Sequence, residues 1–162
     1  MNRRVTTKVA LLAMAACMAW WTCGSPAQTP QEDVHSSAHT VMPFDMSKTV
    51  HIFRMTEQGG IQRVVIRDAS AKEQIAPIQQ HLRQEAERFQ QGDYSDPGML
   101  HGKDMPGLKE LQTGGSKIKV SYAALSDGAE IVFSTDDKHL LTAIHRWFGA
   151  QLSEHGADAK AE

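Results

Sequence analysis

The chain has 162 residues, which is enough for one domain of ordinary size and too few for two. Hydrophobic residues make up 41% of it and charged residues 22%, a balance typical of globular proteins rather than disordered or membrane-embedded ones. The formal net charge of −2 provides no concentrated basic surface for phosphate groups, so nucleic acid is not expected as a partner.

Residues 1–27 predict a secretory signal peptide. Three basic residues precede the apolar run Val9–Trp21, which is too short to span a bilayer core of about 30 Å. Small residues place the cleavage site after Ala27, which predicts a periplasmic or secreted protein exported by a Sec-type signal. The alternative is lipoprotein processing at Cys17, where "MAAC" resembles a lipobox. The chain would then contact a membrane only through its lipidated N-terminus.

Cysteine is expected to be absent from the exported domain, because Cys17 and Cys23 are the only cysteines and both lie in the predicted signal peptide. This excludes disulfides, thiolate zinc sites and cysteine nucleophiles from that domain. A bound metal would have to be held by histidine, carboxylate or methionine side chains. No glycine-rich phosphate loop is present, so no nucleotide cofactor is expected.

The remaining chain divides into three predicted parts. Residues 28–41 are polar and predict a flexible tether, 42–156 predict a single folded domain, and 157–162 predict a disordered tail. In the domain, "KTVHIFRM" and "IQRVVIR" flank "TEQGG", a pattern that predicts a β-hairpin with glycines in its turn. A second hairpin is predicted where "KIKVSYAAL" and "AEIVFST" flank "SDG".

A helix is predicted after each hairpin. The first begins near Gln74 and ends at Gly92, and the second runs from Asp136 to Gly156; each places apolar residues on one stripe at about 100° per residue. The element order is therefore ββα–loop–ββα. It predicts an α+β fold with a four-stranded, mainly antiparallel sheet and both helices on one face.

Glu85 is the first candidate site residue, because it falls within the apolar stripe of the first predicted helix. A buried carboxylate is costly unless a cation, a hydrogen-bond donor or a metal accompanies it. His81 lies one turn earlier on the same side of the helix. Two interpretations stay open: Glu85 pairs with His81 or Arg88 at the edge of the core, or His81 and Glu85 are two ligands of a site.

The segment "GDYSDPGMLHGKDMPG" (92–107) supplies the other candidates. It is rich in glycine and proline, and long segments without secondary structure in compact domains are often functional. Because it leaves the first helix, it can bring His101 and Met105 back over that helix, and His51 on the first strand is a further candidate. His, carboxylate and Met ligands without thiols suit copper, or zinc if methionine stays outside the site.

Four stretches resemble a known family: "MPFDMSKTVHIF", "HLRQEAERFQQGD", "MLHGKDMPGL" and "AIHRWFGAQLSEHG". The family consists of small, often exported bacterial proteins that are frequently labelled aspartate carbamoyltransferase. The resemblance covers nearly all of residues 42–158. True carbamoyltransferases carry a Ser-Thr-Arg-Thr phosphate loop and a His-Pro-x-Gln segment, and this sequence has neither. The resemblance therefore implies family membership without that activity, and it assigns no catalytic residue.

These observations predict a small exported binding protein that holds copper, zinc or a small ligand where the first helix meets the long segment. The expected ligands are His81, Glu85 and His101, with His51 and Met105 as further members. One alternative is an enzyme in which Glu85 acts as a general base with His81 or His101.

The other alternative is an interaction module that uses the open face of the sheet, including a homodimer. If Val50 and Ile52 face the helices, that open face carries His51, Phe53, Met55 and Val65.

Overall fold

The structure is a computed structural model that describes residues 29–162, so the predicted signal peptide lies outside the described residues. In this part of the chain, none of the helices has the length and apolar character needed to cross a bilayer. The helices are α1 (Pro30–Val41), α2 (Ile75–Gln90), α3 (Ser95–His101), α4 (Leu108–Gly114) and α5 (Lys138–His155), with short 3₁₀ turns η1 (Met46–Lys48), η2 (Ala69–Gln74), η3 (Gly115–Lys117) and η4 (Gly156–Asp158). The strands are β1 (Thr49–Thr56), β2 (Gly59–Ile66), β3 (Lys119–Leu125), β4 (Gly128–Ser134) and β5 (Ala159–Ala161).

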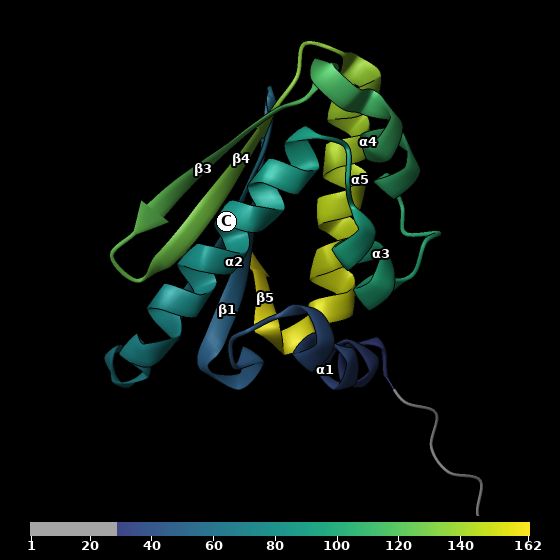
Figure 1. The fold of residues 1–162 in the computed structure, drawn as a ribbon. Helices are drawn as coiled ribbons and strands as arrows, with labels where there is room; N and C mark the ends of the chain where they lie inside the picture. Colours follow the sequence, from purple (N-terminus) through teal and green to yellow (C-terminus); the bar gives the residue numbers. More distant parts are fainter. Residues whose placement is uncertain (1–28) are drawn as a thin grey trace, which may run out of the picture.

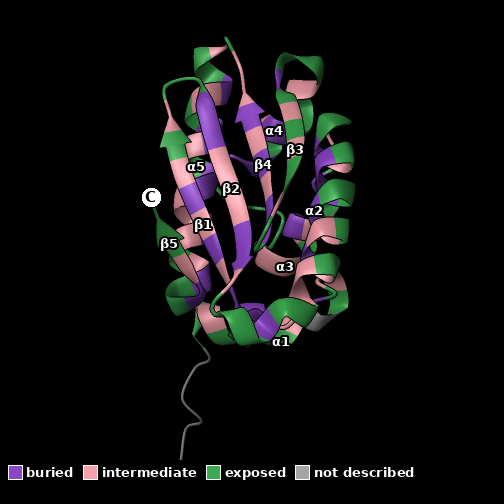
Figure 2. Ribbon diagram, turned by 90° about the vertical axis from the view of Figure 1, so that its left-hand side faces the viewer, coloured by how far each residue is buried: buried purple, intermediate pink, exposed green. Residues whose placement is uncertain are grey.

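The strands form one mixed sheet in the order β3-β4-β2-β1-β5 (Figure 2). The α+β class and both predicted hairpins are confirmed, with β1 antiparallel to β2 and β3 antiparallel to β4. The prediction of four strands was wrong by one, because β5 pairs parallel with the outer edge of β1. The prediction of a disordered tail over 157–162 was wrong for the same reason. Ala159 lies opposite His51, and Glu162 accepts a 2.6 Å hydrogen bond from Arg63.

The segment predicted as a flexible tether, 28–41, contains helix α1. Thr29 and Glu32 form a capping box at its start, in which each side chain accepts a hydrogen bond from the other residue's backbone N–H. Val34 and Ala38, one turn apart, are 2% and 1% exposed. They dock the helix near α3 and α5. Polar composition hid this helix, because Val34 and Ala38 are the only buried side chains among those of α1 that the structure describes.

The long segment predicted between α2 and β3 is also folded, as α3 and α4 joined by a short turn. Pro97, Leu108 and Leu111 are buried along it. Gly107 supplies a backbone φ of 84° before α4, and a Cβ atom there would lie 2.2 Å from the carbonyl oxygen of Ala143 in α5. Glycine therefore permits the close contact that holds α4 against α5.

The helices α2 and α5 pack on the same face of the sheet (Figure 1). Phe133 of β4 shows this directly, because its ring lies 5.8 Å from Phe89 of α2 and 5.5 Å from Trp147 of α5. Side chains of both predicted apolar stripes are buried in this core. On the other face of the sheet, residues 29–162 place no helix (Figure 2).

From the sequence, we considered a strand β1 with Val50 and Ile52 facing the helices. In the structure the side chains of β1 face the other way. His51 and Phe53 are 3% and 1% exposed and face the helices, with the Phe53 ring 5.1 Å from Phe148 of α5. Val50 and Ile52 are half-buried and lie on the open face. The placement of His51 and Phe53 on the open face was therefore wrong, and His51 is directed towards the interior.

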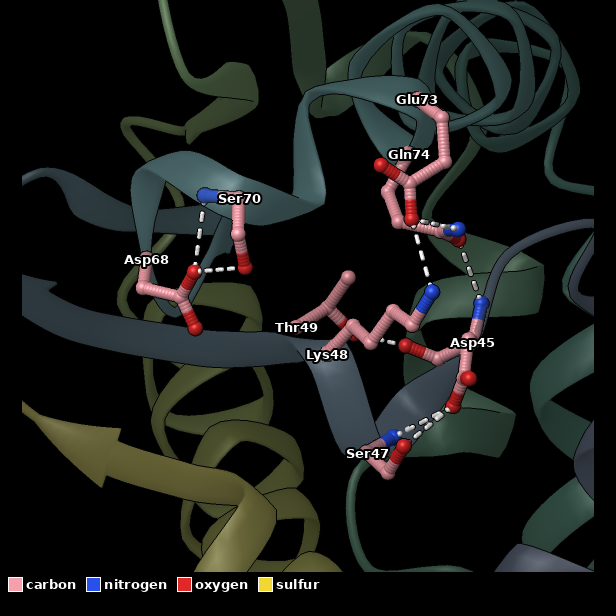
Figure 3. A network of polar contacts seen from close by, with 8 residues as sticks. All are labelled: Asp45, Ser47, Lys48, Thr49, Asp68, Ser70, Glu73 and Gln74. Carbon is pink, nitrogen blue, oxygen red and sulfur yellow. Dashed lines mark hydrogen bonds and ion pairs between the residues drawn. The ribbon is translucent and has the colours of Figure 1, made fainter.

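A polar network fixes the chain entering β1 against the start of α2 (Figure 3). The side chain of Gln74 accepts a 2.8 Å hydrogen bond from the backbone N–H of Asp45, and Lys48 forms a 2.7 Å ion pair with Glu73. This holds the segment 42–45 beside α2, where it forms a wall of the site described next. The residues drawn are Asp45, Ser47, Lys48, Thr49, Asp68, Ser70, Glu73 and Gln74.

Candidate functional site

Four of the five predicted site residues line one small cavity between the sheet, α2, α3 and α5, which we call the inner cavity. They are His51 from β1, His81 and Glu85 from α2, and His101 from the end of α3. The inner cavity has a volume of about 40 Å³. This is enough for one or two water molecules or for the tip of a ligand. Met105, the fifth, is not among the lining residues; it is buried in the core beside α4 instead.

Three imidazoles gather at one end of the inner cavity. The ring of His155, from the end of α5, stacks on His51 at 4.6 Å and meets His101 edge to face at 4.9 Å. The Nδ1 atom of His101 lies 2.7 Å from a carboxylate oxygen of Glu154. Burial lowers the pKa of His51 to about 3 and also lowers the pKa of His101, so both rings are neutral at pH 7.

This arrangement is not a preformed metal site. Lone pairs of imidazole nitrogens lie in the ring plane, and the planes of His51 and His155 are inclined by only 21°, so their lone pairs run in nearly parallel planes. Within residues 29–162, no three His, Cys, Asp or Glu side chains are grouped so that they could hold a metal ion. Coordination by these residues would need at least one ring to rotate.

Several polar atoms that face the interior here have no hydrogen-bond partner within the described chain. They are Nδ1 of His51, Oε1 of Gln62 and Nε1 of Trp147, and all three residues line the inner cavity. Buried polar groups are usually satisfied, and leaving one unsatisfied costs about 1–3 kcal/mol. Because the set contains both a donor and an acceptor, it suits a hydroxyl group or a water molecule.

Glu85 and Asp96 form a carboxyl pair at the mouth of the inner cavity. Arg88 is shared among three acidic residues: it donates to Glu85 at 3.2 Å and to Asp93 at 2.9 Å, and it also contacts Asp96. Burial and the neighbouring Asp96 raise the pKa of Glu85 to about 8 even though Arg88 is close. At neutral pH Glu85 is therefore largely protonated, and it can donate a hydrogen bond or exchange a proton.

A second, larger depression borders some of the same residues, and we call it the outer groove. It has a volume of about 820 Å³ and lies between the end of α1 and the exposed side of α2. His81, Glu85 and Asp96 line both the outer groove and the inner cavity, as do Val41 and Met42. The two spaces therefore share these five lining residues, and we call this shared boundary the neck.

Sequence reasoning missed several residues of this site. Asp96 and His155 were not among the predicted site residues, although both line the inner cavity. His155 is 1% exposed, and its Nε2 lies 3.2 Å from Gln151 one turn earlier. The spacing of Gln151 and His155 on one helix face was a readable signal. The sequence contains no such signal for Gln62 and Trp147, because their place in the site depends on the tertiary packing.

Comparison with known proteins leaves the chain without an assigned family. No model of a known protein family matches the sequence. No curated protein and no solved structure matches it either. The resemblance to small exported proteins labelled aspartate carbamoyltransferase stays a prediction, and function rests on the geometry of the inner cavity and outer groove.

Proposed function

We propose that the protein binds a small polar molecule, which lies in the outer groove and places one polar group in the inner cavity. The observation that carries this proposal is the shared neck: His81, Glu85 and Asp96 line both spaces. A ligand can therefore reach the unpartnered polar atoms of the interior from solvent. Concave sites with mainly apolar walls and a few convergent polar groups are typical of ligand binding.

The volumes of the two spaces suit a ligand whose body lies in the outer groove and whose polar tip enters the inner cavity. The inner cavity, at about 40 Å³, accepts only a hydroxyl-sized tip, whereas the outer groove, at about 820 Å³, accepts a larger body. Val41, Met42 and Pro43 give the groove an apolar wall, and Gln80 and Gln84 of α2 give it a polar one. A ligand hydroxyl could accept a hydrogen bond from Trp147 and donate one to Gln62 or His51.

Trp147 provides the readout for a test. The full chain with Trp20→Phe and Trp21→Phe retains Trp147 as its single tryptophan. Ethylene glycol, ethanolamine and glycolate would be titrated against its fluorescence and its indole NMR signal. We expect at least one of them to produce a saturable change. A set of flat titrations would contradict the proposal.

A matched pair of variants locates the binding. Val41 lines both spaces, whereas Thr40 lines only the outer groove and is exposed. Val41→Phe should obstruct the neck and weaken the binding, while Thr40→Phe should leave it nearly unchanged. If the two variants behave alike, the ligand does not pass through the neck.

A second candidate function is the binding of a copper or zinc ion, and one observation favours it. Burial lowers the pKa values of His51, His81 and His101, so their rings are neutral and their lone pairs are available to a metal. Elemental analysis after exposure to each ion would test it, with His81→Ala and His101→Ala as variants. His139, which is exposed, provides the control His139→Ala. One ion per chain, lost in both variants and kept in the control, is the result that this candidate requires.

A further inference from the structure

We propose that the group held at the neck, beside Glu85 and Asp96, is a cation, and that the ligand is a small organic amine. This inference rests on the proposed binding of a small polar molecule and names its chemical class. It starts from the charges that line the neck and the outer groove.

The charge balance at the neck favours a positive ligand group. Among the described residues that line the outer groove, Glu85, Glu87 and Asp96 are acidic and Arg88 alone is a permanent cation. Asp93, beside the groove, adds a further carboxylate on Arg88. One guanidinium therefore faces several carboxyl groups, and an anionic ligand would increase an existing repulsion.

The protein also engages all three nitrogens of the Arg88 guanidinium, through four of its five N–H donors. Its Nε donates to Asp93, its Nη1 lies between Glu85 and Asp96, and its Nη2 donates to Ser95 at 2.5 Å. It has no free edge for the two parallel hydrogen bonds by which arginine binds a carboxylate or phosphate. This excludes Arg88 as an anion receptor unless the network opens.

Desolvation increases the attraction for a cation. The side chains of Glu85 and Asp96 are 8% and 16% exposed, so water screens their charge poorly. An ammonium group at the neck would donate to Asp96, and to Glu85 once its binding has displaced the Glu85 proton. The raised pKa of Glu85 agrees with this, since it reflects a negative charge that is disfavoured there without another cation.

Observations independent of the acidic residues point to an organic ligand rather than a bare ion. The His51 side chain lines the inner cavity, is 3% exposed and has an Nδ1 without a partner in the described chain. Trp147 offers an unpartnered N–H at the same cavity, and a donor of this kind cannot bind a metal. More than half of the lining residues are apolar, with Phe44 and Phe89 among them. An amine with a nearby hydroxyl would use the carboxyl pair and the unpartnered atoms together.

Three probes of similar size and different charge test this inference in the single-tryptophan chain described above. Ethanolamine is cationic at pH 7, ethylene glycol is neutral and glycolate is anionic. We expect ethanolamine to bind at least about ten-fold more tightly than ethylene glycol, the equivalent of ~1.4 kcal/mol, and glycolate to bind most weakly. Glu85→Gln and Asp96→Asn should each remove this preference. Glu57→Gln makes the same charge change at an exposed turn and should retain it.

The outcomes separate this inference from the proposed function. If ethylene glycol still binds to Glu85→Gln and Asp96→Asn, both variants have kept the fold and the cavity. Equal affinity of the wild type for ethanolamine and ethylene glycol would overturn the cation while leaving the binding function intact. If no probe binds, both proposals fail. A different result would be that zinc chloride binds, ethanolamine does not, and Glu85→Gln abolishes the zinc binding. The cation at the neck would then be a metal ion, and the proposed amine ligand would be refuted.

Discussion

His51 should make the folded chain sensitive to acid, and His51→Leu should remove much of this sensitivity. The ring is buried between β1 and α5, next to Phe44 and stacked on His155. Burial, the largest cause, lowers its pKa from 6.5 to about 3, and His101 and His81 contribute in the same direction. Leucine has a similar size and no titratable group, so it can occupy the site without a proton.

The sign and size of the effect follow from proton linkage. Between pH 6.5 and pH 3 the unfolded chain protonates His51 and the folded chain does not, so the free energy of unfolding falls as the pH falls. One proton bound on unfolding corresponds to ~1.4 kcal/mol per pH unit. From pH 6.5 to pH 4.5 the loss from His51 alone should therefore be about 2–3 kcal/mol.

Glu85 acts in the opposite direction and must be separated from His51. Its pKa in the folded chain is raised from 4.5 to about 8, so its contribution to the free energy of unfolding is lost as the pH rises from 4.5 through 8. The difference between wild type and His51→Leu cancels this contribution if Glu85 is undisturbed. That difference, rather than the wild-type curve, is the quantity to compare.

Urea unfolding at half-unit steps from pH 7 to pH 4, followed by far-UV circular dichroism, measures the effect. We expect the stability of His51→Leu to depend less on pH than that of the wild type, by ~1 kcal/mol per unit at the acidic end. His139→Leu, at an exposed position, is the control and should follow the wild type. Parallel curves for wild type and His51→Leu would refute the assignment of His51 as a neutral buried base.

Three further predictions concern the fold around the site. Gly60→Ala should lower the free energy of unfolding by about 1–3 kcal/mol in a denaturant titration, because the new Cβ would lie 2.3 Å from the buried ring of Phe148. Arg88→Ala should lower the free energy of unfolding by about 1–3 kcal/mol at pH 7, because the hydrogen bonds of Arg88 to Glu85, Asp93 and Asp96 are lost; an unchanged denaturant midpoint would contradict this. Thr29→Ala should lower the stability of α1 by about 1 kcal/mol, because the helix loses its N-terminal cap. Hydrogen exchange in α1 should then become faster. Thr113→Ala in α4 is the control and should leave that exchange unchanged.

The hairpins and the two long helices could be predicted because their patterns repeat over many residues. The period-two alternation of β3 and the apolar stripes of α2 and α5 each involve several side chains, so one exception does not hide them. The same patterns placed His81 and Glu85 on the inner side of α2, and both line the inner cavity. Local periodicity was sufficient there because the two residues belong to one helix.

The short or tertiary features could not be predicted in this way. Helix α1 docks through Val34 and Ala38, and β5 has three residues that pair only because β1 offers a free edge. The face of β1 was ambiguous, because Val50 and Ile52 are as apolar as the side chains that turned inwards. The meeting of His155 with His51 depends on where α5 ends relative to the sheet, which no local pattern encodes.

The neck has a consequence for how quickly a ligand could leave. Val41, the last residue of α1, and Met42, which follows it, form one side of the neck, and neither lies in the sheet. A brief detachment of α1 would therefore open the inner cavity to water without breaking a pair of strands. Such local opening requires less free energy than global unfolding. For a ligand bound as proposed, the residence time would then depend on how firmly Val34 and Ala38 hold α1 against the rest of the domain.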